Sequence, residues 1–144
     1  MTTSNTIIQT RYAETDQMGV IHHSQYLIWC EIGRTDFIEK LGFSYTQMEQ
    51  DGLLAPVTEV NLQYKQALRY PETAHIATWL SDYTGIRATY AYTITNDKGQ
   101  VCVEGTTTHV VVTADRFRPV SMKKVAPEWH RVYENEVQSK RDKL

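Results

Sequence analysis

The sequence has few of the residues that build disulfide scaffolds or membrane spans. Its 144 residues include two cysteines, Cys30 and Cys102, and neither belongs to a Cys-x-x-Cys pair. This scarcity argues against a disulfide framework and favours a reducing compartment. No apolar run approaches the roughly 18 residues that a membrane-spanning helix needs, and polar residues 1–5 do not resemble a secretory signal. We therefore expect a cytoplasmic protein without a membrane span.

The sequence also lacks a charge excess and a linker. The formal net charge is -2, with 22% charged and 41% hydrophobic residues, so nucleic acid is not an expected partner. No stretch rich in Pro, Gly or Ser divides the chain, and no repeat is visible. We predict one domain over residues 1–144, ending in a polar, solvated tail from about 128–144.

One long helix is predicted over residues 24–41. Ser24 is a candidate N-cap and Gly42 a candidate C′ residue. The first half of this helix is apolar nearly all round, so we expect other structure to enclose it. The residues predicted to share its buried face recur at steps of three or four: Tyr26, Cys30, Gly33, Phe37 and Leu41.

Most of the remaining chain alternates as strands do. Asn96 to Gly99 is typical of a hairpin turn, and Pro127 suits the start of a short helix over 127–138. One long helix among strands joined by short turns indicates an antiparallel sheet packed on a helix, an α+β fold. The predicted strands are 6–12, 57–64, 73–82, 86–95 and 100–113.

The densest polar cluster lies between the first strand and the helix. It combines Asp16, Gly19 and the adjacent His22 and His23 with a helix start. Free N–H groups at a helix start can hold a developing oxyanion, and a carboxylate can act as base or nucleophile in acyl transfer. From the residues alone, Asp16 is either catalytic or a turn-forming residue.

The run from Arg11 to Tyr26 resembles the signature of the 4-hydroxybenzoyl-CoA thioesterase branch of hotdog proteins, which includes the YbgC-like acyl-CoA thioesterases. Glu31 and Arg34 resemble the Glu-Arg pattern of that family, and residues 64–71 resemble its aromatic-and-proline stretch. The similarity in element order covers roughly residues 5–120. It implies a hotdog fold, in which a curved antiparallel sheet wraps around one long central helix.

The resemblance also implies an activity and its residues. Asp16 falls at the family's catalytic carboxylate, which attacks the thioester carbonyl or activates water. His23 falls at the position whose backbone N–H polarises that carbonyl, and Gly19 would keep the loop close to the acyl group. The expected substrate is an acyl-CoA or an acyl-carrier-protein thioester. CoA is then part of the substrate, with no metal and no prosthetic group. The expected assembly is a homodimer, paired into a tetramer, with its active sites at the dimer interface.

Three further candidate substrate-binding residues have structural alternatives. His22 and Tyr26 are candidates beside the catalytic loop, although His22 could simply satisfy the helix start and Tyr26 could belong to the core. Glu31 either lines the pocket or pairs with Arg34 three residues later. A metal site at His22 and His23 is disfavoured, because adjacent histidines diverge.

Cationic side chains are the candidates for binding the CoA phosphates, because CoA carries several negative charges. They are Arg87, Arg116 and Arg118, and solvated surface charge is the alternative for each. The sequence does not identify the acyl group of the substrate. Residues that could shape its pocket are Tyr45, Met48, Leu53, Leu54 and Tyr64.

Two other functions remain open at this stage. A non-catalytic acyl-CoA or acyl-carrier binding protein would bind thioesters without hydrolysing them, since fold does not fix function. A hotdog hydratase or dehydratase would use a His with a carboxylate in a different arrangement.

Overall fold

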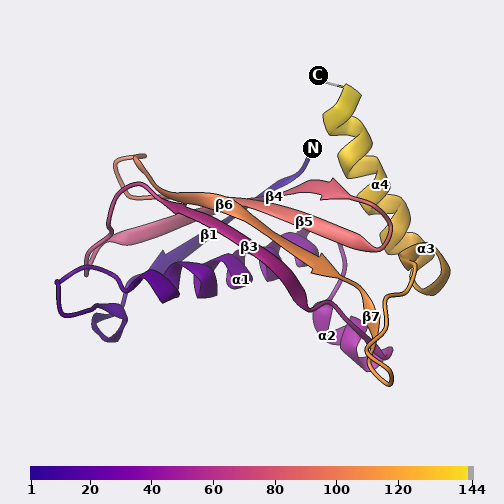
Figure 1. Ribbon diagram of the computed structural model, residues 1–144. Coiled ribbons are helices and arrows are strands. Elements are labelled where there is room, and N and C mark those ends of the chain that lie inside the picture. The colour runs from indigo at the N-terminus through magenta and orange to yellow at the C-terminus, as the bar shows by residue number, and fades with distance from the viewer. Residues whose placement is uncertain (143–144) are drawn as a thin grey trace.

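The centre of the structure is a five-stranded antiparallel sheet. The computed structural model describes residues 1–142, and the side chains of residues 1–139. The strands lie in the order β1-β4-β5-β6-β3, and a separate two-stranded sheet joins β2 to β7 (Figure 1). The strands are β1 (Thr3–Gln9), β2 (Leu53–Leu54), β3 (Val57–Tyr64), β4 (Thr73–Tyr83), β5 (Arg87–Thr95), β6 (Val101–Val110) and β7 (Val112–Thr113). The helices are the 3-10 turn η1 (Tyr12–Glu14), α1 (His23–Lys40), α2 (Tyr45–Gln50), α3 (Met122–Val125) and α4 (Pro127–Asp142).

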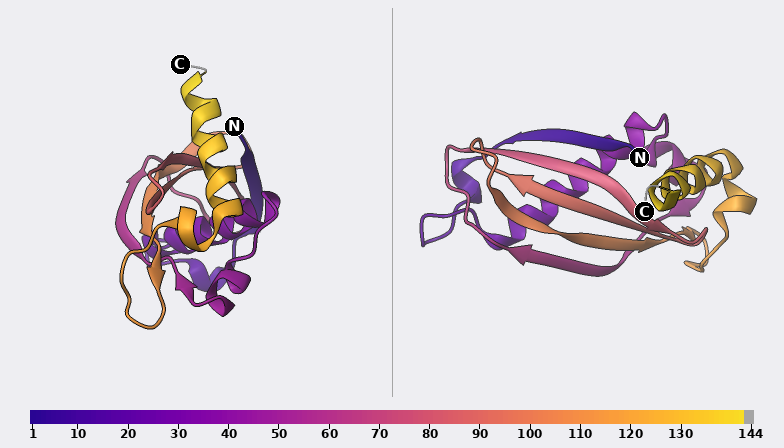
Figure 2. Two further views of the ribbon diagram at one scale, coloured as in Figure 1. Left: turned by 90° about the vertical axis from the view of Figure 1, so that its right-hand side faces the viewer. Right: turned by 90° about the horizontal axis from the view of Figure 1, so that it is seen from above.

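The sheet curves around α1, which lies along its concave face (Figures 1 and 2). α1 packs mainly against β1 and β4, near one side of the sheet. The sheet is not closed, because β1 and β3 remain as its two edges. This arrangement is the α+β layout expected from the sequence.

The buried face of α1 is largely the predicted one. Tyr26, Cys30 and Phe37 are buried, whereas Leu41 is half-buried at the helix end. Gly33 allows a close approach to the sheet, since a Cβ there would lie 2.6 Å from Oγ1 of Thr78. The predicted N-cap was wrong by two residues: His22 caps the helix, and the Ser24 amide donates to Nδ1 of His22 over 3.2 Å.

The prediction that other structure encloses α1 on most sides was wrong. Ile28 is 47% exposed and Ile32 is 41% exposed, on the face turned away from the sheet. β3 is also exposed along its length, with Val60 and Tyr64 only partly covered. The sheet curves over one side of the helix only, so an apolar surface of α1 and β3 remains open.

The predicted strands occur, with shifted boundaries. β3 has the predicted bounds 57–64, and β1 begins three residues earlier than expected. Gly99 has the positive φ of 76° that the predicted turn requires. The predicted strand 100–113 is interrupted at Val111 and continues as β7 in the second sheet. The short elements α2, β2 and α3 were not predicted, because they lack room for a full hydrophobic period.

The C-terminal segment is a helix that belongs to the core. α4 buries Trp129, Tyr133 and Val137 against the end of the sheet. The prediction of a solvated tail over 128–144 was therefore wrong for these positions, because every fourth residue of an otherwise polar helix is apolar. Residues 143 and 144 end both the predicted tail and the domain predicted over 1–144, and they lie outside the residues that the structure describes. Within residues 1–142 no helix is both long and apolar enough to cross a membrane.

Candidate active site

The polar cluster between β1 and α1 folds as a narrow hairpin. The Asp16 amide donates to the Val20 carbonyl over 2.8 Å, and the His22 amide donates to the Glu14 carbonyl over 2.8 Å. Gly19, with a φ of 81°, turns the chain and donates to the Asp16 carbonyl. Its positive φ explains why glycine suits this position. The hairpin returns the chain from Asp16 directly to the start of α1.

A buried carboxylate anchors this hairpin to the helix. Glu14 is 4% exposed, and its side chain accepts hydrogen bonds from Trp29 Nε1 at 3.0 Å and from the Arg11 amide at 2.7 Å. The Arg11 guanidinium also lies 3.5 Å from this carboxylate. Sequence analysis missed this role of Glu14. The sequence signal for this role was the pair of Glu14, two residues before Asp16, and Trp29, fifteen residues after Glu14.

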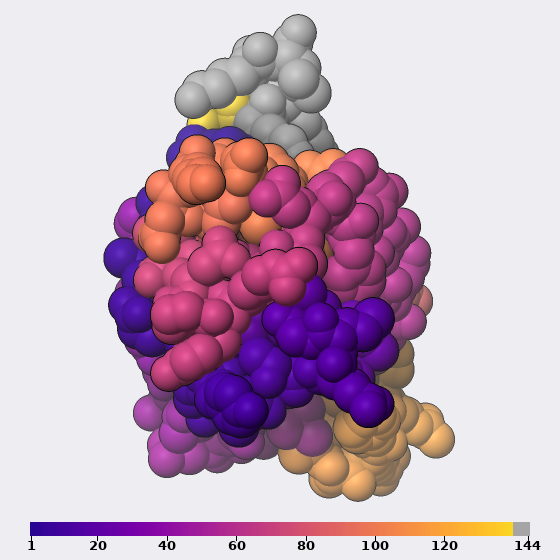
Figure 3. All heavy atoms as spheres, turned by 90° about the vertical axis from the view of Figure 1, so that its left-hand side faces the viewer, coloured from indigo at the N-terminus to yellow at the C-terminus, as the bar shows by residue number. Residues whose placement is uncertain are grey.

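The segment after β3 holds the other side of the hairpin. The Ile21 amide donates to the Leu68 carbonyl over 2.9 Å, and Arg69 donates to the Gly19 carbonyl over 3.4 Å. Figure 3 shows this end of the molecule, where the indigo N-terminal residues lie against the magenta residues that follow β3. The position of Asp16 therefore depends on two segments about fifty residues apart.

Asp16 borders an open groove with a volume of about 270 Å³. Its Oδ1 accepts hydrogen bonds from the Met18 amide at 2.8 Å and the Val20 amide at 3.4 Å. No described residue donates to Oδ2, so one carboxylate oxygen remains available for a substrate or water. The groove is lined by Asp16, Met18, Val20, Ile21, His23, Tyr26, Tyr64, Lys65, Gln66 and Ala67.

The start of α1 borders the same groove. His23 is the first residue of the helix, and its amide donates to no group among the described residues, as is usual for a first-turn N–H. The Tyr64 hydroxyl donates to the His23 carbonyl over 3.2 Å, and the two rings meet edge to face. The His22 and His23 rings stack with centroids 4.3 Å apart. The structure thus brings together Asp16 and His23, the two residues predicted to be catalytic.

Tyr26 has a structural role and also lines the groove. It is 3% exposed, and its hydroxyl accepts a hydrogen bond from the Leu68 amide at 3.0 Å. Burial raises the pKa of Tyr26 above its ordinary value, while the hydrogen bond from Leu68 acts in the opposite direction. Tyr26 is therefore neutral at physiological pH and supports the wall of the groove.

Glu31 and Arg34 do not form the ion pair that the sequence left open. Glu31 is exposed on the outward face of α1. Arg34 turns inward instead, with Nη1 2.9 Å from Nδ1 of His109. Glu31 is thus outside the groove of its own chain.

The candidate phosphate-binding arginines lie at the far end of the sheet. β5 begins at Arg87, opposite Val110 at the end of β6, whereas Tyr64 of the groove pairs with Val103 near the start of β6. Arg116 and Arg118 are exposed on the loop that follows β7, at the lower right of Figure 1. Within one chain, none of these three arginines lies beside Asp16.

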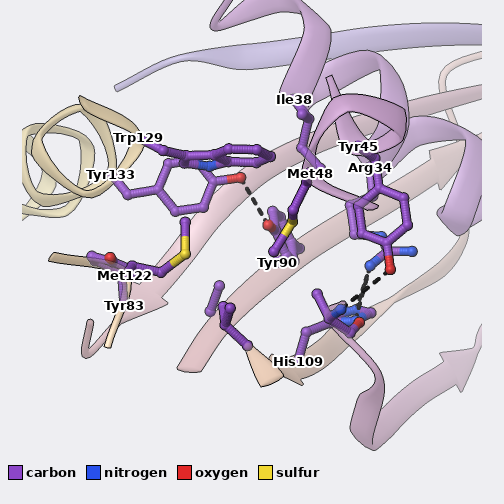
Figure 4. A pocket seen from close by; sticks show the side chains of 13 residues that line it. Arg34, Ile38, Tyr45, Met48, Tyr83, Tyr90, His109, Met122, Trp129 and Tyr133 are labelled. Carbon is purple, nitrogen blue, oxygen red and sulfur yellow. Dashed lines mark hydrogen bonds between the residues drawn. The ribbon is translucent and has the colours of Figure 1, made fainter. Parts of the chain in front are cut away.

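A second, more enclosed cavity lies near that far end. Tyr45 and Met48, two of the residues considered for the acyl pocket, line it together with Arg34 and His109 (Figure 4). Burial, and secondarily the Arg34 charge, lower the pKa of His109 to about 4. No cluster of three or more His, Cys, Asp or Glu side chains suited to a metal ion occurs among the residues that the structure describes.

Comparison with known proteins identifies the family. The model of the thioesterase-like superfamily matches residues 10–130. The chain belongs to the thioesterase-like superfamily. The expected hotdog fold and the expected class, a thioester hydrolase, are both confirmed by this membership and by the relatives below.

Three relatives support the assignment to the thioesterase-like superfamily, two of them over most of the chain and the third over three quarters of it. The protein named "Putative acyl-CoA thioesterase YneP" of Bacillus subtilis is 46% identical over 127 residues, which cover 88% of this chain and 92% of that protein. A solved DHNA-CoA thioesterase from Staphylococcus aureus superposes with a TM-score of 0.95 at 42% identity, covering 99% of this chain and 95% of that one. A 1,4-dihydroxy-2-naphthoyl-CoA hydrolase of Synechococcus is 29% identical over 117 residues, covering 75% of this chain and 86% of that protein.

Proposed function

We propose that this thioesterase hydrolyses acyl-CoA at the groove between Asp16 and the start of α1. The observation that carries this proposal is that the free carboxylate oxygen of Asp16 and the unpartnered amide of His23 border one groove. A thioester carbonyl lying between them would accept a hydrogen bond from the His23 amide. The amide would stabilise negative charge as the carbonyl oxygen becomes an oxyanion.

The reaction needs a nucleophile opposite that amide. Asp16 either attacks the carbonyl carbon or takes a proton from the attacking water. If Asp16 attacks, a C–O bond to its carboxylate forms as the C–S bond breaks, and water then hydrolyses the resulting anhydride to release the acid and free Asp16. If water attacks instead, its oxygen forms the new C–O bond as the C–S bond breaks. In both routes the net reaction consumes one water, and a proton from that water ends on the departing CoA thiolate. Because backbone amides hold Oδ1 of Asp16, the other oxygen has a defined direction without help from a further side chain. In this proposal Gly19 shapes the hairpin, while His22 and Tyr26 support the groove.

The remaining binding residues require a second subunit, so the proposed unit is a homodimer. Exposed apolar residues lie on both α1 and β3, and β3 is a free sheet edge. A two-fold axis through this surface would place the far end of one chain beside the groove of the other. Glu31, Arg87, Arg116 and Arg118 could then reach a bound CoA in trans.

Further parts of the proposal come from the family resemblance and the chain's thiols. Pairing of dimers into tetramers is proposed from the resemblance. Cys30 and Cys102 are buried free thiols, which supports a cytoplasmic location. For the acyl group we propose a hydroxylated aromatic ring, on the basis of the names of the Staphylococcus and Synechococcus relatives.

The test is release of thiol from a panel of aliphatic and aromatic acyl-CoAs. Asp16→Asn should lower kcat/KM by at least about 100-fold, as expected for loss of a general base or nucleophile, with an unchanged melting temperature. Asp51→Asn is the matched control, because Asp51 is exposed and, among the described residues, its carboxylate accepts a side-chain hydrogen bond from Gln47 alone. Full turnover by Asp16→Asn would refute the role of Asp16. Tight binding without thiol release would indicate a binding protein, and hydration of crotonyl-CoA would indicate a hydratase.

A further inference from the structure

Arg34 is a cation without an anionic partner. Its guanidinium carries five N–H donors, and the described residues supply one acceptor for them, the ring of His109 at 2.9 Å. The rest of the guanidinium faces aromatic rings, with its carbon 5.7 Å from the Tyr45 centroid and 6.0 Å from the Tyr90 centroid. Figure 4 shows Arg34 and Tyr45 pointing toward His109 across the cavity. No described carboxylate lies within ion-pair distance of Arg34.

The surroundings of Arg34 leave its charge uncompensated. The His109 ring is buried, with Nδ1 3.0 Å from the Ala55 carbonyl and Nε2 3.0 Å from the Thr107 hydroxyl. Burial and the Arg34 charge lower the pKa of His109 and keep the ring neutral, whereas the Ala55 contact acts in the opposite direction. The Tyr45 hydroxyl accepts a hydrogen bond from the Ala55 amide over 3.2 Å, which leaves its own proton free to donate. Half-buried donors that lack acceptors cost free energy unless an acceptor enters.

The free space beside Arg34 fits one small polar group. The cavity volume is about 20 Å³, close to what a single water or oxygen atom occupies. The whole ring of an aromatic acyl group would not fit there. A hydroxyl or phenolate oxygen projecting from such a ring would fit, and it would meet donors from both Arg34 and Tyr45.

The position of Arg34 on α1 relates this cavity to the groove of a partner subunit. Arg34 lies eleven residues after His23, about 16 Å along the helix axis. The midpoint between them falls at Ile28 and Trp29, and Ile28 is one of the two exposed large apolar residues described on α1, together with Ile32. An isologous contact of two antiparallel α1 helices centred on Ile28 therefore brings His23 of one subunit opposite Arg34 of the other.

Pairing of two β3 edges would lead to the same arrangement of the two subunits. β3 begins at Val57, which pairs with His109 of the cavity, and ends at Tyr64, which lines the groove. If two β3 edges pair antiparallel about their common centre, Val57 of one strand lies opposite Tyr64 of the other. Either contact would place the groove of one subunit beside the cavity of its partner.

We propose that Arg34 of the partner subunit binds an oxygen substituent of the acyl group whose thioester lies at Asp16. This inference rests on the proposed function and on the proposed dimer. Arg34 then determines acyl specificity, with Tyr45 as a second donor. An acyl group without the oxygen leaves the guanidinium without its acceptor and is a poorer substrate.

The first experiment compares two substrates that differ in one oxygen. Thiol release is measured for 2-naphthoyl-CoA and for 1-hydroxy-2-naphthoyl-CoA. The wild type should prefer the hydroxylated substrate at least about tenfold in kcat/KM. Arg34→Gln should bring the ratio close to one, Arg34→Lys should retain part of the preference, and Arg131→Gln should leave it unchanged. Arg131 is a suitable control because it is an exposed arginine paired with Glu128 on α4.

The outcomes separate this inference from the proposed function. An equal loss on both substrates would show that Arg34 is structural and would overturn the inference. A wild-type ratio near one would also overturn it, whether or not the variants fold. Neither result would affect the role of Asp16, which is tested by Asp16→Asn alone.

The second experiment tests whether the site is shared between subunits. Asp16→Asn and Arg34→Gln chains carrying different tags are co-expressed, and the mixed dimer is isolated. If each site takes Asp16 from one chain and Arg34 from the other, one of its two sites is intact. The mixed dimer should then show about half the wild-type turnover of the hydroxylated substrate. If both residues act within one chain, every site carries a defect and turnover of the hydroxylated substrate stays at or below that of the Arg34→Gln homodimer, which would overturn the inference.

Discussion

The buried His109 makes the stability of the protein depend on pH. The pKa of this side chain falls from its ordinary 6.5 to about 4, chiefly because burial disfavours the charged ring and secondarily because of the Arg34 charge. Between these values the unfolded chain binds a proton that the folded chain does not. The free energy of unfolding therefore falls as the pH is lowered from 6.5 toward 4, and this contribution is constant above 6.5.

The size of the effect follows from the two pKa values. The pKa of His109 is 6.5 in the unfolded chain and about 4 in the folded one. This difference corresponds to about 3 kcal/mol of unfolding free energy once the ring is protonated in both states, and about 2 kcal/mol of it is lost by pH 5. Carboxylates add their own dependence at low pH, so the useful quantity is a difference between variants. His109→Gln should lose about 2 kcal/mol less than the wild type between pH 7.5 and pH 5.

The measurement is urea denaturation at several pH values and one fixed protein concentration, because the proposed dimer would make stability depend on concentration. His75→Gln is the matched control, since it removes a half-exposed histidine on the outer side of the sheet. This control should retain the wild-type decline. Equal declines in His109→Gln and the wild type would refute the neutral, buried state of His109 and the electrostatics assigned to the cavity.

Three further substitutions test how the fold holds the site. Trp129→Ala should cost about 3–5 kcal/mol of stability in urea denaturation, because the indole is buried; a cost below about 1 kcal/mol would show that α4 is a dispensable tail. Glu14→Ala should cost about 2–4 kcal/mol, because it leaves the buried Trp29 N–H without an acceptor, and thiol release should fall with it; wild-type stability would contradict the anchoring role. Gly105→Ala should destabilise by at least about 1–3 kcal/mol, since its Cβ would overlap the Asn61 carbonyl that lies on β3; an unchanged unfolding midpoint would contradict the close pairing of β3 with β6.

The hairpin that carries Asp16 could be predicted from the sequence because its signals are local. Asp16, Gly19 and the helix start lie within a few residues of one another, so a hairpin at a helix N-terminus brings them together without information from the rest of the chain. The buried stripe through Cys30 and Phe37 was readable for the same reason, because helical periodicity is a local property.

Other features depended on contacts between distant segments. Leu68 and Arg69 hold the Asp16 hairpin, yet nothing around them in the sequence points to residue 19 or 21. The orientation of Arg34 toward His109, rather than toward Glu31, depends on where β6 passes beneath α1. A Glu and an Arg three residues apart predict an ion pair within the helix. Tertiary packing turns Arg34 toward the sheet instead, so this pair does not form.

The sequence by itself determined the long helix and the five long strands, the buried stripe of α1 and the placement of a carboxylate just before a helix start. These follow from periodicity and turn chemistry, which act over a few residues. The tertiary structure decided that α4 belongs to the core, that Glu14 anchors the loop, and that Arg34 faces a cavity at the opposite end from Asp16. Those outcomes depend on which distant surfaces exclude water together, and that is fixed by the packing of the whole sheet around one helix.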